Sequence, residues 1–374
     1  MNFELSDEQK DVQKAAREFA QGEFDPDVAL ELDQSGTFPE SIWKKACQLG
    51  FIGIHYPEEF GGQGLSLFEN ILVIEAFCRV DSGIGSALSM GDVGSEVILK
   101  FGSKDQKKQF LIPLTKGAKR MSIAFAESED GKDYSSISTV AERKGEEYLI
   151  HGAKRFVLNA SLADAFIILC KERKEGWITL IVGREKEGIE VIPIEKIGLR
   201  MVPFGDLRLK EVRVSLENRI GSEGEGMAYV NHCHQVMGLR SAAQALGTAQ
   251  GAFDRAREYS KQREQFGKKL SQFQVIRHKL ADMAVGIEVA RWLTYKSAIE
   301  HEQGKIDPEF LSITQLEVRR RLTGVVDEAL QIFGGYGYIV EQAIEHYFRD
   351  TWAIGVELGT EEELKDRIAE RILK

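Results

Sequence analysis

The sequence predicts a multidomain chain of the α+β class, with helical parts at both ends and a β-structured part between them. One observation behind this prediction is periodicity. Apolar residues recur at helical spacing toward both ends of the chain, whereas short runs of strand formers occupy the middle. The other is length, because 374 residues, 43% of them hydrophobic, suffice for two or three cores. We expect the domains to span residues 1–117, 118–226 and 227–374.

The N-terminal region is expected to be helical. Ser6, followed three residues later by Gln9, forms the pattern of a capping box. Pro39 begins a second helical stripe, and further helices are expected at about 66–80 and 86–101. These helices lead directly into the region where the periodicity changes.

The middle region is expected to form a compact β domain, a barrel or a sandwich. Its segments 148–150, 166–169, 178–182 and 207–209 are short and rich in strand-forming residues. Turn pairs that contain glycine separate several of them.

The C-terminal region is expected to be helical again. The stretches 228–262, 271–303 and 308–333 contain no internal proline, and Pro308 occupies a first helical position. Thr360, with a glutamate three residues later, caps a final short helix.

Composition excludes several classes of function. Lys plus Arg number 49 against 59 Asp plus Glu, a formal net charge of −10, and no stretch gathers basic and aromatic residues as a nucleic-acid platform would. The four cysteines are scattered, so we expect free thiols and no zinc site. The start does not resemble a signal peptide, and no apolar run has the length of a transmembrane helix. We therefore expect a cytoplasmic protein.

The chain resembles the acyl-CoA dehydrogenase flavoprotein family over essentially its whole length. Each matching motif is weak alone, but their order and spacing together are highly specific. The matching segments are Phe38-Pro39 to Leu49-Gly50, Pro57 to Gly64, Glu127 to Asp133, Gly152 to Ala160, Gly198-Leu199-Arg200, Arg263 to Gly267 with Phe273-Gln274, Gln331 to Tyr338, and Arg349-Asp350.

The resemblance implies an enzyme that oxidises an acyl-CoA thioester with FAD and passes the electrons to an electron-transfer flavoprotein. It implies a homotetramer whose subunit has an N-terminal helical domain, a central β-barrel and a C-terminal four-helix bundle. A thioester carbonyl acidifies its α C–H, so a carboxylate can remove that proton while a hydride leaves the β carbon for the flavin.

The resemblance also assigns residues to the cofactor and the substrate. The isoalloxazine is expected against Phe125, Ala126, Glu127, Phe156, Val157 and Leu158. The rest of FAD is expected against Arg263, Gln265, Phe266, Gln274, Thr360 and Glu362, and against Gln331, Phe333, Gly334 and Gly335 of a neighbouring subunit. The substrate is expected against Asp92, Lys132, Arg240 and Gly359, with Arg240 facing the CoA portion.

The catalytic base departs from the family pattern. Family members place a glutamate at one of two positions, and these are Leu358 and Leu239 here, neither of which accepts a proton. Asp92, aligned with a helix that lines the acyl pocket, is the candidate we favour, and Glu357 is the alternative. Asp92 is otherwise an exposed residue or the cap of a helix break. Glu96, one turn later, either assists it or is exposed.

A base at Asp92 predicts a different reaction. It would take a proton from the far end of the acyl group, as in the subgroup that converts cyclohex-1-ene-1-carboxyl-CoA to cyclohexa-1,5-diene-1-carboxyl-CoA in anaerobic aromatic degradation. The alternatives are α,β-dehydrogenation of another acyl-CoA with Glu357 as base, an acyl-CoA oxidase, and a catalytically silent acyl-CoA or acyl-carrier binding protein.

Overall fold

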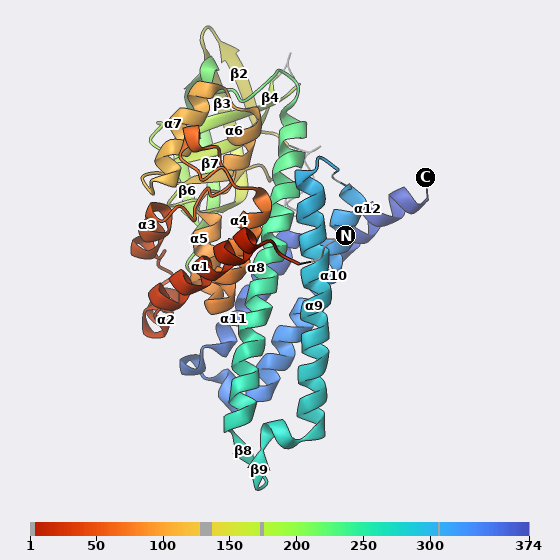
Figure 1. Cartoon of the computed structure of the whole chain (residues 1–374). Helices are drawn as coiled ribbons and strands as arrows, with labels where there is room; N and C mark the ends of the chain where they lie inside the picture. Colours follow the sequence, from red (N-terminus) through yellow and green to blue (C-terminus); the bar gives the residue numbers. More distant parts are fainter. Residues whose placement is uncertain (1–3, 128–136, 173–175, 306, 374) are drawn as a thin grey trace.

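The computed structural model describes residues 4–127, 137–172, 176–305 and 307–373. It confirms the predicted order of a helical part, a β-sheet part and a second helical part. Figure 1 shows an elongated molecule in which the sheet lies at one end and the long C-terminal helices extend to the other. The N-terminal helices lie along the flank between them.

Helices α1 and α5 pack against α4, which also contacts α8 (Gly226–Gln262) of the C-terminal part. Almost every side chain of α4 is buried, as expected for a helix that is apolar nearly all round. The capping box at Ser6 and Gln9 is confirmed. The elements are α1 (Asp7–Glu23), α2 (Pro26–Ser35), α3 (Glu40–Gln48), η1 (Glu58–Phe60), α4 (Leu67–Val80), α5 (Ser82–Met90), α6 (Ser95–Phe101) and α7 (Lys104–Thr115).

The prediction of one helix over 86–101 is wrong, because the chain forms α5 and α6 with a turn between them. Gly94 has a φ of +94°, a left-handed conformation that favours glycine. A Cβ at Gly91 would overlap the ring of Trp43. Asp92 therefore lies in the turn between α5 and α6. The expectation that it lies on a helix lining the acyl pocket is wrong.

The middle part is one seven-stranded sheet, in the order β1-β4-β2-β3-β7-β6, with β5 paired to β4. All four predicted strand segments lie inside β3, β4, β5 and β7. The elements are β1 (Met121–Ala124), β2 (Val140–Lys144), β3 (Glu147–Leu158), β4 (Ala165–Glu172), β5 (Gly176–Gly183), β6 (Ile189–Pro193), β7 (Phe204–Ser215) and η3 (Leu216–Asn218).

Helix α8 runs through the centre of the C-terminal part and contacts α4, α9, α10 and α11. Small residues allow this close packing: a Cβ at Gly247 would overlap the backbone of Glu75 in α4. The elements are α8 (Gly226–Gln262), β8 (Glu264–Gln265), β9 (Lys268–Lys269), η4 (Leu270–Gln272), α9 (Gln274–Glu302), α10 (Pro308–Phe333), η5 (Gly334–Tyr338), η6 (Val340–Gln342), α11 (Ile344–Leu358) and α12 (Glu361–Ile372).

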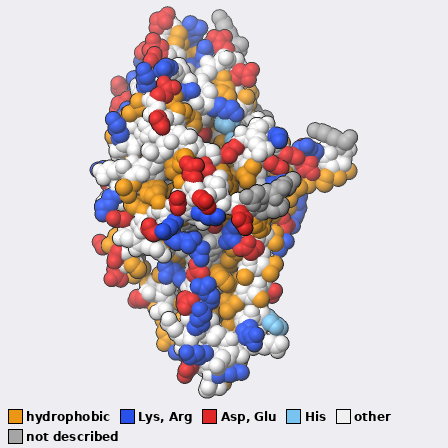
Figure 2. Space-filling view, in the orientation of Figure 1, with side chains coloured by type: hydrophobic (Ala, Val, Ile, Leu, Met, Phe, Trp, Pro, Cys, Tyr) orange, Lys and Arg blue, Asp and Glu red, His pale blue; other side chains and the backbone are white. Residues whose placement is uncertain are grey.

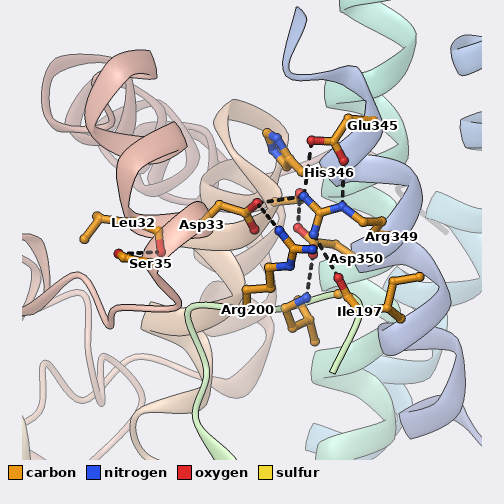
Figure 3. A network of polar contacts seen from close by, with 12 residues as sticks. Leu32, Asp33, Ser35, Ile197, Arg200, Glu345, His346, Arg349 and Asp350 are labelled. Atoms are coloured by element: carbon orange, nitrogen blue, oxygen red, sulfur yellow. Dashed lines mark hydrogen bonds and ion pairs between the residues drawn. The ribbon is translucent and has the colours of Figure 1, made fainter. Parts of the chain in front are cut away.

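A polar network ties α11 to the other two parts of the chain (Figure 3). Arg349 Nη2 lies 2.7 Å from Asp33 Oδ2 in α2, and Arg349 Nη1 donates to the carbonyl of Ile197 at 2.9 Å. Asp350 accepts hydrogen bonds from Ser82 Oγ and from the backbone N–H of Leu199, both at 2.6 Å. The network fixes the position of α11, whose last turn reaches the candidate active site.

No helix within the described ranges is both long enough and apolar enough to cross a membrane.

Candidate active site

A pocket lies between the α5–α6 turn and helix α8, and the last turn of α11 closes one side of it. It encloses about 340 Å³ of space, part of it open to solvent. The lining residues are Ser89, Met90, Val93, Gly94 and Glu96 from the turn and its helices, Cys233, Val236, Met237, Arg240, Ser241 and Gln244 from α8, and Glu357 from α11.

Glu357 faces this pocket directly. Its side chain is half-buried, and Ser241 Oγ donates a hydrogen bond to Glu357 Oε2 at 3.2 Å. Helix α11 continues through Leu358, so the side chains of Glu357 and Leu358 point in directions about 100° apart around the helix axis. Leu358 is 1% exposed and belongs to the hydrophobic core. The helix register therefore brings a carboxylate to the pocket from the residue before the family's base position.

Leu239, the other family base position, is also buried in the core and is 1% exposed. It lies on α8 beside Arg240. No carboxylate replaces it at that position in the chain.

Asp92 is buried, with 1% of its surface exposed, and it is paired. Arg240 Nη2 donates to Asp92 Oδ1 and also to the carbonyl of Ser89. The hydroxyl of Tyr56 lies 3.1 Å from Asp92 Oδ2 and 2.6 Å from Ser95 Oγ. Burial, with the negative charge of Asp92, raises the pKa of Tyr56 well above its usual value, so Tyr56 stays protonated and donates to the carboxylate.

Asp92 does not line the acyl pocket itself. It lines a second, smaller cavity inside the N-terminal part, together with apolar residues of α4 such as Phe77. Arg240 and Ser89 border both cavities. Asp92 therefore lies in the pocket wall behind the guanidinium of Arg240, and a substrate atom in the pocket meets Arg240 before Asp92.

Glu96 also lines the pocket and is buried, which excludes the alternative that it is simply exposed. His55 Nε2 lies 2.5 Å from Glu96 Oε1. Burial alone would raise the pKa of Glu96, but the charge and hydrogen bond of His55 outweigh it and lower that pKa to about 2. Glu96 is therefore held as a carboxylate by His55 and is a weak proton acceptor.

The two segments expected around the isoalloxazine lie side by side: residues 125–127 directly follow β1, and residues 156–158 end β3. The N–H of Arg155 donates to the carbonyl of Ala126 at 2.8 Å. The register of β3 against β7 shifts between Lys154 and Val157, and Phe156 in this bulge has a φ of +58° and is 38% exposed. The ring of Phe156 stacks with Phe204 at 6.0 Å between centroids and lies 4.7 Å from the Arg155 guanidinium, and this partly exposed aromatic surface is of a kind that fits a planar flavin ring.

Lys154 holds this surface together, a role that the sequence analysis missed. Its side chain is fully buried, and Nζ lies 2.7 Å from Glu127 Oε1 and 3.3 Å from the carbonyl of Phe125. Glu127 also accepts hydrogen bonds from the backbone of Ser138 and Thr139. Burial opposes ionisation of Glu127, but Lys154 and these donors outweigh it and lower its pKa to about 2.

The residues expected around the rest of FAD gather at the far end of the molecule. The β8–β9 hairpin lies at the tip of the long helices, opposite the sheet (Figure 1). The Arg263 guanidinium lies 5.2 Å from the ring centroid of Tyr336, so the hairpin and η5 are adjacent. Phe266 in this cluster is 94% exposed, and Gly334 and Gly335 have open space beside them. Gln265 on β8, Gln274 at the start of α9 and Gln331 near the end of α10 are exposed, whereas Phe333 is buried.

The predicted residues that follow α11 are also placed. Thr360 caps α12 through its hydroxyl, as expected, and Glu362 is exposed in the first turn of that helix. Gly359 has a φ of +106°, and its carbonyl accepts from Arg319. Lys132 lies outside the described residues, so its expected contact with the substrate stays a prediction.

Sequence reasoning missed the Ser89–Gln244 pair in the pocket and the contact of Tyr56 with Asp92. Gln244 Nε2 donates to Ser89 Oγ at 2.7 Å, and its Oε1 is buried without a partner among the described residues. Tyr56 stands directly before the matched Pro57 segment, and Gln244 follows Arg240 by one helical turn. Helical spacing would have placed Gln244 beside Arg240, but nothing in the sequence paired Tyr56 with Asp92.

Three family profiles match the chain in succession. Residues 6–118 match the profile described as "Acyl-CoA dehydrogenase, N-terminal domain", residues 122–212 match the middle domain, and residues 224–373 match the C-terminal domain. The match covers all three parts of the fold.

Curated relatives and solved structures are similar over the whole length. A protein named "Acyl-CoA dehydrogenase, short-chain specific" from Clostridium acetobutylicum is 34% identical, covering 100% of both chains. The CarC subunit of the caffeyl-CoA reductase-Etf complex from Acetobacterium woodii is 33% identical, covering 99% of both. The structure of butyryl-CoA dehydrogenase from Megasphaera elsdenii superposes with a TM-score of 0.94 at 32% identity, covering 100% of both chains.

Proposed function

The chain belongs to the acyl-CoA dehydrogenase family, and on that premise we propose that it oxidises a short or cyclic acyl-CoA thioester, with Glu357 accepting the proton. The observation that carries this proposal is the position of Glu357, which lines the pocket although both family base positions are leucine. Family membership makes the protein an oxidoreductase acting on CH–CH groups.

Glu357 has the surroundings that a general base needs. Its carboxylate borders the pocket, and the hydroxyl of Ser241 holds one of its oxygens. A bound thioester would place its α C–H where Glu357 can remove the proton. The apolar residues Val236 and Met237 on the same wall exclude water from that face of the acyl group.

Two clusters of residues fit FAD. Phe125, Ala126 and Glu127, with Phe156, Val157 and Leu158, would hold the flavin ring, and Lys154 fixes that surface. Arg263, Gln265, Phe266 and Gln274, with residues 331–335, would hold the remainder. When bound, FAD supplies the acceptor for the hydride that leaves the β carbon.

The two clusters lie at opposite ends of one chain (Figure 1), so one FAD needs a cluster from each of two copies. The surface of the chain supports such an assembly. Figure 2 shows hydrophobic side chains over the lower helices, and Val275, Val285, Trp292 and Ile299 of α9 are each at least 40% exposed. A soluble monomer rarely leaves so many large apolar side chains along one helix. We propose a homotetramer on this basis.

The electron acceptor proposed is an electron-transfer flavoprotein. This follows from the relative in Acetobacterium woodii, whose name places it in a complex with such a protein. An acyl-CoA oxidase would instead react rapidly with dioxygen after reduction by substrate.

A second candidate function rests on Asp92. Its burial beside the pocket wall is the observation in favour, because a buried carboxylate is costly without a purpose. With Asp92 as base the enzyme would convert cyclohex-1-ene-1-carboxyl-CoA to cyclohexa-1,5-diene-1-carboxyl-CoA. The geometry weighs against it, because Arg240 and the Tyr56 hydroxyl already donate to the two carboxylate oxygens of Asp92, and Asp92 does not line the acyl pocket.

The test is an anaerobic titration of the purified protein with straight-chain, dicarboxylic and alicyclic acyl-CoA thioesters. The proposal predicts a yellow protein whose flavin absorbance bleaches with a short or cyclic thioester. Bleaching by cyclohex-1-ene-1-carboxyl-CoA alone would favour the second candidate. A colourless protein, or flavin that no thioester reduces, would contradict both and favour a silent acyl-CoA binding protein.

A further inference from the structure

The acyl pocket contains a buried arginine whose charge is already neutralised from within the chain. Arg240 borders the pocket and is 6% exposed. Its Nη2 contacts Asp92 Oδ1 and the carbonyl of Ser89, and Asp92 is its only ion-pair partner among the described residues. A buried guanidinium that lacked Asp92 would strongly attract another carboxylate.

The other carboxylates of the pocket do not take the place of Asp92. Glu96 is paired with His55, and Glu357 accepts a hydrogen bond from the hydroxyl of Ser241. Neither forms an ion pair with Arg240. Asp92 is therefore the direct counter-ion of Arg240, while Glu96 acts on the guanidinium charge without contacting it, and Asp92 lines the second cavity and not the acyl pocket.

A substrate with a second carboxylate at the end of its acyl group would meet an unfavourable site. It would find Arg240 already paired, and it would lie near the two carboxylates of Glu96 and Glu357, which line the same pocket. Repulsion of like charges and the loss of hydration would both oppose its binding. A neutral acyl group meets neither penalty, so the pocket discriminates by charge.

We propose that Asp92 is a specificity-determining residue, an internal counter-ion to Arg240 that restricts this enzyme to uncharged acyl groups. This proposal rests on the proposed function and narrows its substrate class. It assigns Asp92 no proton transfer. It also predicts how to reverse the selectivity: replacing Asp92 by asparagine keeps the size of the side chain and leaves the guanidinium for a carboxylate of the substrate.

The experiment compares wild type with Asp92→Asn on matched acyl-CoA pairs. Pentanoyl-CoA and hexanoyl-CoA are the neutral substrates, and glutaryl-CoA and adipyl-CoA are their dicarboxylic counterparts. The readout is the ratio of kcat/KM for the dicarboxylic thioester to that for the neutral one. Asp92→Asn is expected to raise this ratio by roughly 100-fold, since an unpaired buried charge is costly and the substrate would pair it.

A double variant, Asp92→Asn with Arg240→Met, is the matched control. It removes both charges of the pair, so the ratio of kcat/KM for dicarboxylic to neutral thioesters should return to the wild-type value. Binding of glutaryl-CoA, measured by calorimetry in a Glu357→Gln background, gives a readout independent of turnover. There, tighter binding is expected only where Asp92 is replaced and Arg240 is kept.

Three results would overturn the proposal. They are an unchanged ratio in Asp92→Asn, a gain that persists without Arg240, and loss of flavin reduction by every thioester in a variant that still binds FAD. The last result would identify Asp92 as the base. If wild type fails to reduce its flavin with any thioester, the proposed function itself fails, and this is seen before any variant is made.

Discussion

Replacing Lys154 by methionine should destabilise the sheet and release the flavin. The ammonium group is fully buried and contacts Glu127 and the Phe125 carbonyl. Methionine fills similar space but leaves the Glu127 carboxylate, whose side chain is 10% exposed, without its cation. Removing one partner of a buried pair costs about 3–5 kcal/mol, and the remaining donors at Ser138 and Thr139 favour the lower value of ~3 kcal/mol.

This loss converts to a measurable change in Tm. If all 374 residues unfold together, ~3 kcal/mol corresponds to a fall of roughly 4 °C, and the fall is larger if the sheet unfolds separately. The assay is thermal unfolding with flavin content measured after gel filtration. Lys144→Met on β2 is the control, because its ion pair with Glu142 is exposed and contributes less than about 1 kcal/mol.

The difference in Tm between wild type and Lys154→Met should also depend on pH. The pKa of Glu127 falls from its usual 4.5 to about 2 in the folded protein, so the pair stabilises the fold above pH 4.5 and loses this effect as the pH drops toward 2. The gap in Tm between wild type and Lys154→Met should stay constant from neutral pH to about pH 5 and shrink below that. A gap no larger than that of the Lys144→Met control, or one that does not shrink in acid, would refute the reasoning.

Three further substitutions test the geometry. Tyr56→Phe removes the hydroxyl between Asp92 and Ser95 and should lower the free energy of unfolding by about 1–2 kcal/mol in urea denaturation. Gly94→Ala forces a side chain into a left-handed conformation and should cost about 1–3 kcal/mol, measured in the same way. Arg349→Ala removes the cation that joins Asp33 of α2 to Glu345 of α11 and leaves Asp33 with the longer contact to Arg200 alone, so it should lower Tm and slow flavin reduction.

Each of these has an outcome that would contradict it. Stability of Tyr56→Phe equal to wild type would mean that the hydroxyl bridges nothing in solution. A neutral Gly94→Ala would argue that α5 and α6 form one helix after all. Normal flavin reduction in Arg349→Ala would mean that the polar network is not needed to hold Glu357 in position.

The sequence was enough to predict the fold, because the fold depends mostly on local patterns. Capping boxes, strand-forming runs and proline-free stretches are properties of neighbouring residues, and they place the long helices within a few residues of their observed ends. The break between α5 and α6 was missed because it depends on contacts from far away. Gly91 is required there by the ring of Trp43.

The site was harder to predict than the fold. Asp92 and Arg240 are 148 residues apart in the chain, and no local pattern shows that they pair. The orientation of Glu357 depends on α11 continuing through Leu358, and helix ends are poorly determined by sequence. The residues expected around FAD came from the family resemblance, and the structure places some beside the ends of β1 and β3 and others around the β8–β9 hairpin and η5.

The most direct test of the account measures the rate of flavin reduction under anaerobic stopped flow, with a neutral acyl-CoA that reduces the wild type. Glu357→Gln and Asp92→Asn are compared as FAD-loaded proteins. We predict that Glu357→Gln slows reduction by about 10²–10⁴-fold, the usual contribution of a general base, whereas Asp92→Asn stays within roughly tenfold of wild type. Near-normal reduction in Glu357→Gln, with reduction abolished in Asp92→Asn, would contradict the account.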